Sequence, residues 1–256
     1  MNSFVFRLAV NDFKKKYAGS VLGAVWALIH PLVTVGMYYV VFGRIFPNQR
    51  SSGSEIPFVL FLTGGLVPWF YFSEALSGAT MSLHEYNYLV KKIVFKVETL
   101  PLIKVISAFF VHVFFSVILI ILGCVYGHTP TPRLMALPYY MICLVIITLA
   151  LSYLCSAICA FTKDMAQIVS IALQIGLWAT PVMWDINSLS DNGLKRILKW
   201  NPLVYVVNGY RNCIYGDGNA FGRAGDALYF WIFTAVLFLI GFMVFRRLED
   251  HYADVL

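Results

Sequence analysis

The sequence predicts an all-α integral membrane protein with six membrane-spanning helices, an amphipathic interfacial helix before the first span and a re-entrant helical hairpin before the last. The first observation is composition, because 60% of the 256 residues are hydrophobic and 12% are charged, whereas a soluble domain carries about 25% charged residues. The second is a series of apolar runs long enough for a helix to cross the hydrocarbon core, which takes roughly 20 residues. So few charges cannot cover a water-soluble surface. We therefore expect membrane lipids around the chain and no nucleic acid, despite a formal charge of +6.

Residues 3–17 predict an amphipathic helix that lies on the cytoplasmic leaflet. One face is apolar and the roughly opposite face is polar and basic: Phe6, Ala9, Val10, Phe13 and Tyr17 against Arg7, Asn11, Lys14 and Lys15. A basic flank that only sets the topology is the alternative. A cleaved signal peptide is not expected, because the apolar run 21–42 exceeds the about 7–15 residues of a signal-peptide core.

Six apolar windows predict the membrane spans: about 21–44, 56–76, 102–126, 134–161, 165–184 and 228–245. Gly19 and Gly23 would let the chain turn into the first span and pack closely, and Pro31 would kink that span. Pro68, which follows two glycines, predicts a broken or kinked second span. The short segment 162–164 predicts a tight turn between the fourth and fifth spans.

The placement of Lys and Arg favours cytoplasmic termini. With both termini inside, most of the 19 basic residues fall on the internal side, including the triplet 14–16 and the cluster within 91–104. No soluble domain is evident, so residues 1–256 are expected to form one multi-pass transmembrane domain.

Residues 185–215 are too polar to span the membrane and too apolar for a free loop. Two helix-length halves, 189–200 and 202–215, join where Asn201 precedes Pro202, and Pro at the first helical position after an Asn cap is a favourable helix start. Two short helices dipping into the outer leaflet would form a re-entrant hairpin. An external amphipathic cap is the alternative.

The sequence offers little catalytic chemistry. It contains no G-x-x-x-x-G-K-[ST] phosphate loop, no H-E-x-x-H and no G-x-S-x-G, so neither an enzyme nor a metal site is expected. The five cysteines are expected to be small buried hydrophobes. Ionisable residues inside a membrane are candidates for function. For His112, however, we expect a hydrogen-bonded packing residue, with a proton relay as the alternative, and for Glu74 a position at the internal end of the second span.

Aromatic residues are abundant, with 21 Phe, 15 Tyr and 6 Trp. Many are expected to face lipid or to lie in interfacial belts. Aromatic faces with polar tips also suit sugar rings, which present apolar C–H faces and hydroxyls. If a substrate pathway exists, the residues expected along it are Tyr38, Tyr39, Phe42, Trp69, Phe70, Trp178 and Trp184.

Four segments resemble, in order, the type-2 ABC transporter permeases that export polysaccharides. They are DFKKKYAGSVLGAVWALIHPL at 12–32, LTGGLVPWFYFSEAL at 62–76, NYLVKKIVFKVETLPL at 87–102 and NPLVYVVNGYRNCIYG at 201–216. The first segment carries the family's spacing of acidic, basic, Tyr, Ser, Leu-Gly, Trp and Pro residues. The chain departs from the pattern at Lys96, where the family often has proline after a phenylalanine.

The resemblance implies a channel lined by two copies of the chain, with two copies of a separate ATPase subunit docked beneath. ATP and Mg²⁺ would be bound by that partner, and no cofactor is expected in this chain. The implied substrate is a long glycan on a polyprenyl diphosphate lipid, with O-antigen foremost and teichoic acid or capsule next. The implied location is the bacterial plasma membrane.

The resemblance also assigns roles to residues. The cytoplasmic loop 82–98 and the N-terminal interfacial helix would receive the motion of the ATPase, with 162–164 as a lesser contact. The coupling candidates are Ser82, Glu85, Asn87, Lys91, Lys92 and Glu98. The basic residues that could attract the lipid diphosphate at the inner entrance are Arg7, Lys14, Lys15 and Lys16. Topology determinants alone are the alternative for these cations.

Three other functions compete with polysaccharide export. A type-2 permease for a drug or a small lipid would share the topology but would not need so many aromatic residues. A membrane glycosyltransferase acting on polyprenyl lipids would need a carboxylate pair or a catalytic His at an interface, and none stands out. A proton-coupled flippase would need buried acidic residues, of which the apolar runs offer almost none.

Overall fold

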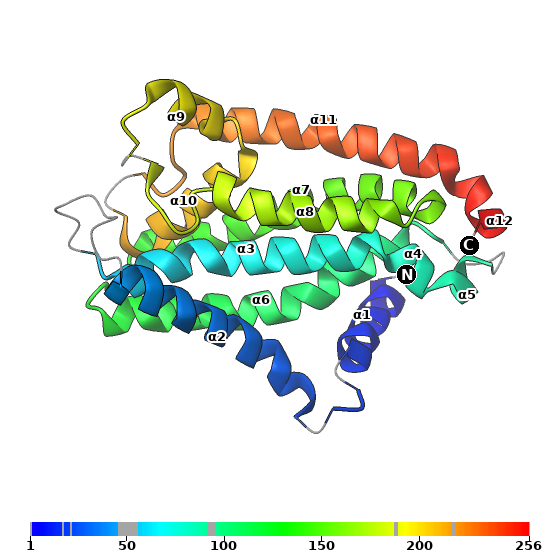
Figure 1. Cartoon of the computed structure of the whole chain (residues 1–256), viewed down its shortest axis with the longest axis horizontal. Helices are drawn as coiled ribbons and strands as arrows, with labels where there is room; N and C mark the ends of the chain where they lie inside the picture. Colours follow the sequence, from blue (N-terminus) through cyan, green and yellow to red (C-terminus); the bar gives the residue numbers. More distant parts are fainter. Residues whose placement is uncertain are drawn as a thin grey trace.

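The protein is helical throughout the part that the computed structural model describes. The described residues are 2–16, 18–20, 22–45, 56–91, 96–186, 189–216 and 219–255. Their long helices α3 (Phe58–Thr80), α6 (Thr99–Val125), α7 (Leu137–Phe161) and α11 (Ala224–Leu248) run roughly along one axis (Figure 1). Helix α3 packs on α6 and α7, and α11 packs on α7. The predicted all-α class is confirmed.

The two ends of the bundle differ (Figure 1). Both chain termini lie at one end together with α1 (Asn2–Lys16), α4 (Ser82–Glu85), α5 (Asn87–Val90) and α12 (Tyr252–Val255), and we call this the terminal end. Helices α9 (Asn192–Lys199) and α10 (Pro202–Tyr215) lie at the opposite end, which we call the hairpin end.

Five helical segments in the described residues are long and apolar enough to cross a membrane. They are Trp26–Ile45, Phe58–Thr80, Thr99–Val125, Pro132–Phe161 and Ala224–His251. The fifth predicted span is the shorter apolar helix α8 (Asp164–Ala179), whose 16 residues cover about 24 Å at 1.5 Å per residue. Its predicted end at 184 is wrong, because Thr180 is extended (φ −92°, ψ 132°), as expected for a residue that precedes proline.

Helix α3 runs without interruption through Gly64, Gly65 and Pro68, so of the predicted alternatives, a break or a kink, the break does not occur. The two glycines serve close approach instead. A Cβ added at Gly65 would lie 2.4 Å from the carbonyl oxygen of Val182, and one added at Gly64 would lie 3.2 Å from Cγ of Arg211. Glycine therefore allows the segment after α8 and a side chain of α10 to pack directly on the α3 backbone.

Helix α1 crosses the terminal end of the bundle (Figure 1) and packs on α6. Its buried residues Val5, Ala9 and Asp12 follow helical spacing and form the docking face. The predicted apolar face is only partly correct, because Phe6 is 54% exposed. The side chain at position 17, which was assigned to the same face, lies outside the described residues.

A turn with two glycines at positive φ leads from α1 to the first predicted span. Gly19 has φ +87° and Gly23 has φ +50°, backbone conformations that favour glycine. Helix α2 (Trp26–Val40) then continues as the π-helix η2 (Val41–Ile45). The first half of α2 stands away from the bundle (Figure 1), and only 6% of the Trp26–Ile45 window is buried.

The segment before the last span forms two helices that join at Asn201, as predicted. The Asn201 side chain accepts a hydrogen bond from the backbone N–H of Leu203 at 3.0 Å, and Pro202 opens α10. Helix α10 inserts among α3, α6, α7 and α11, whereas α9 lies on the outside of the bundle (Figure 1). The pair therefore combines an inserted helix with an external amphipathic one.

Candidate functional site

Charged and hydroxyl side chains join three elements at the terminal end. Lys104 of α6 forms an ion pair with Asp12 of α1, with 2.7 Å between Nζ and Oδ1, and a second ion pair with Glu85 of α4. The Tyr86 hydroxyl donates to Oδ1 of Asp12 at 2.6 Å. We call these four residues the terminal ion network. It ties the N-terminal helix and the short helix α4 to the long helix α6.

The centre of this network is shielded from water. The side chains of Asp12 and Lys104 are 8% and 13% exposed. Burial and the hydrogen bond to Asp12 raise the pKa of Tyr86, so the phenol stays protonated and remains a donor. A charge pair in this setting depends on both partners, because loss of one leaves the other buried without compensation.

The α4–α5 unit has further ties at the terminal end. Nε2 of His84 donates to the carbonyl oxygen of Cys159 near the end of α7 at 2.8 Å. After the loop, Glu98 pairs with Arg246 at the end of α11, with 2.9 Å between Oε2 and Nη2. Together with the terminal ion network, these contacts link the loop 82–98 to α1, α6, α7 and α11. A force applied to this loop would therefore reach most of the bundle.

The six predicted coupling residues fall into different environments. Ser82 is buried and donates to the Ala79 carbonyl at 2.7 Å, so it serves the turn after α3. Asn87 and Lys91 are exposed and are available to a partner. Glu85 belongs to the terminal ion network, and Glu98 holds Arg246. Lys92 lies outside the described residues.

The predicted entrance cations lie along α1. Arg7, Lys14 and Lys15 are exposed, while Lys16 forms an ion pair with Glu74 of α3. Glu74 is thus at the terminal end, as expected for the end of the second span, but is paired rather than only solvated.

A cavity of about 500 Å³ lies between α1, α3, α4 and α6. Its charged lining residues are Lys15, Lys16, Lys104, Asp12, Glu74 and Glu85. Three cations face three carboxylates, so the cavity as a whole is balanced in charge. Since Lys16 and Lys104 are already paired with carboxylates, Lys15 is the lining cation best placed to attract an added anion.

Asp12 and Lys104 were not among the predicted site residues. Asp12 entered the sequence reasoning only as part of a motif, and Lys104 only as a topology determinant. The available signal was an acidic residue on α1 at helical spacing from the buried Val5 and Ala9. A carboxylate on a docking face requires a buried partner, although the sequence does not say which cation supplies it.

The predicted aromatic residues are spread over the first span, α3, α8 and the segment after α8. Trp69 is 6% exposed and packs against α8, where a Cβ added at Gly176 would lie 2.8 Å from its indole ring. Phe70 is half-buried on α3, and Tyr38, Tyr39 and Phe42 are half-buried on the first span. The buried position of Trp69 assigns it to helix packing.

Two further aromatic residues lie at and beyond the end of α8. Trp178 is 57% exposed, and the indole N–H of Trp184 donates to its carbonyl oxygen at 3.1 Å. Trp184, like the predicted aromatic residues of the first span, is half-buried.

His112 is a packing residue in the middle of α6. It is 3% exposed, and its Nε2 lies 2.7 Å from the Tyr210 hydroxyl of α10. The Tyr71 ring of α3 lies against the imidazole, with 4.8 Å between ring centroids. The prediction of a hydrogen-bonded packing role is confirmed. The expectation of buried cysteines holds for Cys143, Cys155, Cys159 and Cys213 and is wrong for Cys124, which is exposed.

Arg211 of α10 is a buried cation held by backbone carbonyls. Its guanidinium donates to Pro181 at 2.8 Å, to Val182 at 2.6 Å and to Phe61 at 3.3 Å. It also lies over the Phe61 ring, 3.7 Å from the centroid. The first two carbonyls follow the C-terminal end of α8, where the helix dipole favours positive charge. Arg211 therefore fixes the inserted helix to α3 and to the segment that follows α8.

Taken together, the bundle of apolar helices and the ion pairs at its terminal end define a multi-pass membrane protein. The ABC-2 type transporter family model matches residues 4–215. The chain therefore belongs to the ABC-2 type transporter family and is a transport subunit rather than an enzyme. The family implies an ATPase partner, and the earlier resemblance is confirmed.

Individual relatives give a finer comparison. The chain is 28% identical to the O-antigen export system permease protein RfbA of Myxococcus xanthus over 81% of this chain and 78% of that protein. It is 26% identical to the protein of the same name from Klebsiella pneumoniae over 96% and 92%. It is 22% identical to the polysialic acid transport protein KpsM of Escherichia coli over 95% and 92%.

Proposed function

We propose that the chain is the channel-forming membrane subunit of an ATP-driven exporter. Its substrate is a polysaccharide linked to polyprenyl diphosphate, with O-antigen foremost and teichoic acid or capsule next. The observation that carries the proposal is family membership together with relatives named for O-antigen export and polysialic acid transport over almost their full length. The sequence has no phosphate loop of the G-x-x-x-x-G-K-[ST] type, so ATP and Mg²⁺ bind to the partner subunit.

The ATPase docks at the terminal end, which faces the cytoplasm. The exposed Asn87 and Lys91 lie beside the anchored Glu85. An ATPase that pushes on α4–α5 therefore moves α1 and α6 through the terminal ion network. The anchoring contacts support a coupling role for this loop, because a free loop would absorb the motion.

A second copy of the chain completes the channel. Ile168, Ile171, Ile175 and Trp178 form an exposed apolar stripe at helical spacing along α8. Helix α2 is also largely uncovered, with Met37 64% exposed. Two copies facing each other through these helices would bring the aromatic residues of α2 and α8 toward a shared pathway, where their faces suit sugar rings.

The lipid diphosphate enters beside α1. Arg7, Lys14 and Lys15 supply exposed positive charge at the cytoplasmic surface, where anionic groups are attracted by clustered cations. Lys16 is paired with Glu74 and contributes less.

The test is reconstitution in proteoliposomes with and without the ATPase encoded beside this chain. A polyprenyl-diphosphate glycan with a fluorescent label is loaded on the ATPase side, and its appearance on the other side is measured. Export that requires both the ATPase and ATP is expected. Glycan transport by the chain alone without ATP would refute the proposal, and so would ATP-driven transport that excludes glycans and accepts only small lipids.

A further inference from the structure

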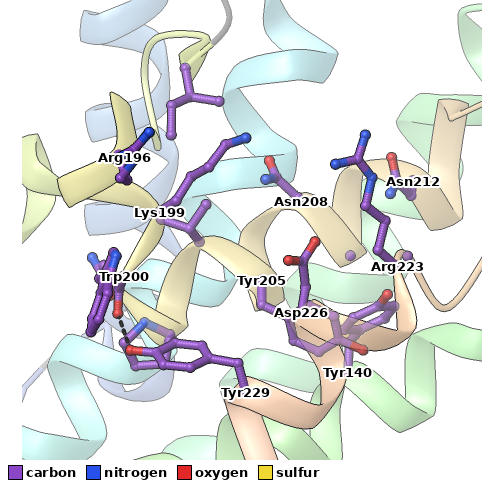
Figure 2. A pocket seen from close by; sticks show the side chains of 16 residues that line it. Tyr140, Arg196, Lys199, Trp200, Tyr205, Asn208, Asn212, Arg223, Asp226 and Tyr229 are labelled. Atoms are coloured by element: carbon purple, nitrogen blue, oxygen red, sulfur yellow. Dashed lines mark hydrogen bonds between the residues drawn. The ribbon is translucent and has the colours of Figure 1, made fainter. Parts of the chain in front are cut away.

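The hairpin end contains a cavity that no predicted site residue lines. It has a volume of about 470 Å³ and lies between α9, α10 and the start of α11 (Figure 2). This size falls within the about 300–1,000 Å³ of typical small-molecule sites. Its lining combines aromatic rings, carboxamides and charges, including Trp200, Tyr205, Asn208, Asn212, Arg223 and Tyr229.

Two aromatic side chains form one wall of this pocket. Trp200 is 68% exposed, and its ring centroid lies 6.2 Å from that of Tyr229. The Tyr229 hydroxyl donates to the Trp200 carbonyl at 2.7 Å (Figure 2), which holds the two residues together. Rigid, partly exposed rings of this kind offer a surface for the C–H face of a sugar.

The opposite wall carries polar groups that the fold does not use. Asn208 and Asn212 are four residues apart on α10 and so share a helix face. Within the described residues, the side chains of Asn208, Arg223 and Asp226 take part in no hydrogen bond or ion pair, and Figure 2 shows them around the same cavity. A carboxamide both donates and accepts hydrogen bonds, which matches adjacent sugar hydroxyls.

The charges of the pocket favour an anion. Arg196 and Lys199 come from α9 and Arg223 from the start of α11, whereas Asp226 is the lining carboxylate. Three cations against one carboxylate leave a positive site. An arginine can bind a carboxylate or a phosphate group through two parallel hydrogen bonds.

The floor of the pocket is fixed before any ligand binds. Gly209 of α10 meets the Tyr140 ring so closely that an added Cβ would lie 2.1 Å from it. The Tyr140 hydroxyl donates to the Ala220 carbonyl at 3.0 Å, and the Tyr205 hydroxyl donates to the Phe221 carbonyl at 3.2 Å. A floor that is already ordered lowers the entropic cost of binding.

We propose that this pocket binds an acidic sugar unit, that is, a sugar ring that carries a carboxylate or phosphate group. The ring would stack on Trp200 and Tyr229, its hydroxyls would bond to Asn208 and Asn212, and its anionic group would pair with Arg223. The position at the outer, exit side of the membrane rests on the proposed export function. Sugar binding itself does not, because it follows from the lining residues.

The test measures binding by isothermal titration calorimetry on the purified chain in lipid nanodiscs. Glucuronic acid is the probe, glucose is the matched neutral sugar, and glycerol 3-phosphate represents a lipid headgroup. We expect glucuronic acid to bind at least about tenfold more tightly than glucose, because a hydrogen bond to a charged group corresponds to that factor or more. Trp200→Ala and Arg223→Gln should each weaken glucuronic acid binding about tenfold.

Two variants serve as matched controls. Tyr126→Ala removes another exposed aromatic residue at the hairpin end, and Lys195→Gln removes a cation of α9 that does not line the pocket. Both should bind as the wild type does, and thermal unfolding checks that every variant is folded. The inference is overturned if the wild type binds no glucuronic acid, if it binds glucose equally well, if the pocket variants bind normally, or if glycerol 3-phosphate alone binds.

The same variants are then taken through the proteoliposome export assay. ATP-driven glycan export by a wild type that binds no glucuronic acid would overturn the pocket and leave the proposed function standing. Glucuronic acid binding that depends on Trp200 and Arg223, without any glycan export, would support the pocket and overturn the proposed function.

Discussion

The terminal ion network predicts that Lys104→Met loosens the N-terminal helix from the bundle. The substitution keeps an unbranched side chain of similar length but removes the charge that faces Asp12 and Glu85. Asp12 would then remain as a nearly buried carboxylate whose partners are the Tyr86 hydroxyl and little water. The expected result is a less stable protein in which α1 is the first element to open.

The expected loss of unfolding free energy follows from the burial of the Asp12–Lys104 ion pair. Removing one partner of a buried ion pair costs about 3–5 kcal/mol, and the Asp12 and Lys104 side chains are 8% and 13% exposed. Glu85 is 48% exposed, so its pairing adds less than about 1 kcal/mol. We expect Lys104→Met to lower the free energy of unfolding by about 3 kcal/mol. Adding Asp12→Asn should recover much of that loss, because it removes the stranded charge but keeps an acceptor for Tyr86.

The assay is unfolding in mixed detergent micelles, followed by circular dichroism, with hydrogen exchange to report on the α1 amides. Lys16→Met is the control, because its pair with Glu74 is exposed on both sides, at 48% and 31%, and such pairs contribute about 0.2–1 kcal/mol. If Lys104→Met destabilised the protein no more than Lys16→Met, or if the added Asp12→Asn deepened the loss, the ion network would not hold α1.

Three further predictions test other contacts. Gly65→Ala should cost about 1–3 kcal/mol in thermal unfolding, because the new methyl group would overlap a backbone carbonyl. Gly36→Ala has open space around it and should not destabilise. The pKa of Tyr86 is raised in the folded protein. Its contribution to the free energy of unfolding is therefore fully present below the ordinary tyrosine pKa of about 10 and is lost as the pH rises above that value. Tyr86→Phe should remove this part of the loss of stability at alkaline pH, and an unchanged pH profile of unfolding would refute the prediction. In a background without exposed Cys124, Met37→Cys on α2 should form a disulfide-linked dimer in membranes, whereas the equally exposed Met243→Cys on α11 should not; equal cross-linking would count against the proposed face.

The class of fold was predictable because it depends on composition and on the length of apolar runs. The helix start at Asn201 was also predictable, since an Asn cap followed by Pro is a local signal. Whether the second span breaks near Pro68 could not be predicted, because glycine and proline can mark either a break or a close approach of another segment. Only the neighbours decide between the two, and at Gly65 the neighbour is the carbonyl of Val182 from another part of the chain.

The functional residues were harder to predict than the helices, because their partners are distant in the sequence. Asp12 and Lys104 meet only when α1 docks on α6. Arg211 donates to carbonyl oxygens that are free to accept because α8 ends before Pro181. The pocket at the hairpin end is lined by residues of four helices, α7, α9, α10 and α11. Local patterns predict each helix but not which faces meet.

Helix α6 connects the terminal end of the bundle to the inserted helix α10. Near the terminal end its Lys104 holds α1 and α4, and farther along the helix His112 is bonded to Tyr210 of the inserted helix α10. A continuous helix transmits displacement along its length. A push on α4–α5 that moves α6 must therefore either carry α10 with it or strain the His112–Tyr210 hydrogen bond. Because Arg211 also ties α10 to α3 and to the segment after α8, through the carbonyls of Pro181 and Val182, the inserted helix cannot follow α6 alone. Motion that begins at the terminal end must therefore displace α3 and the segment after α8 together with α10 if these contacts are to survive.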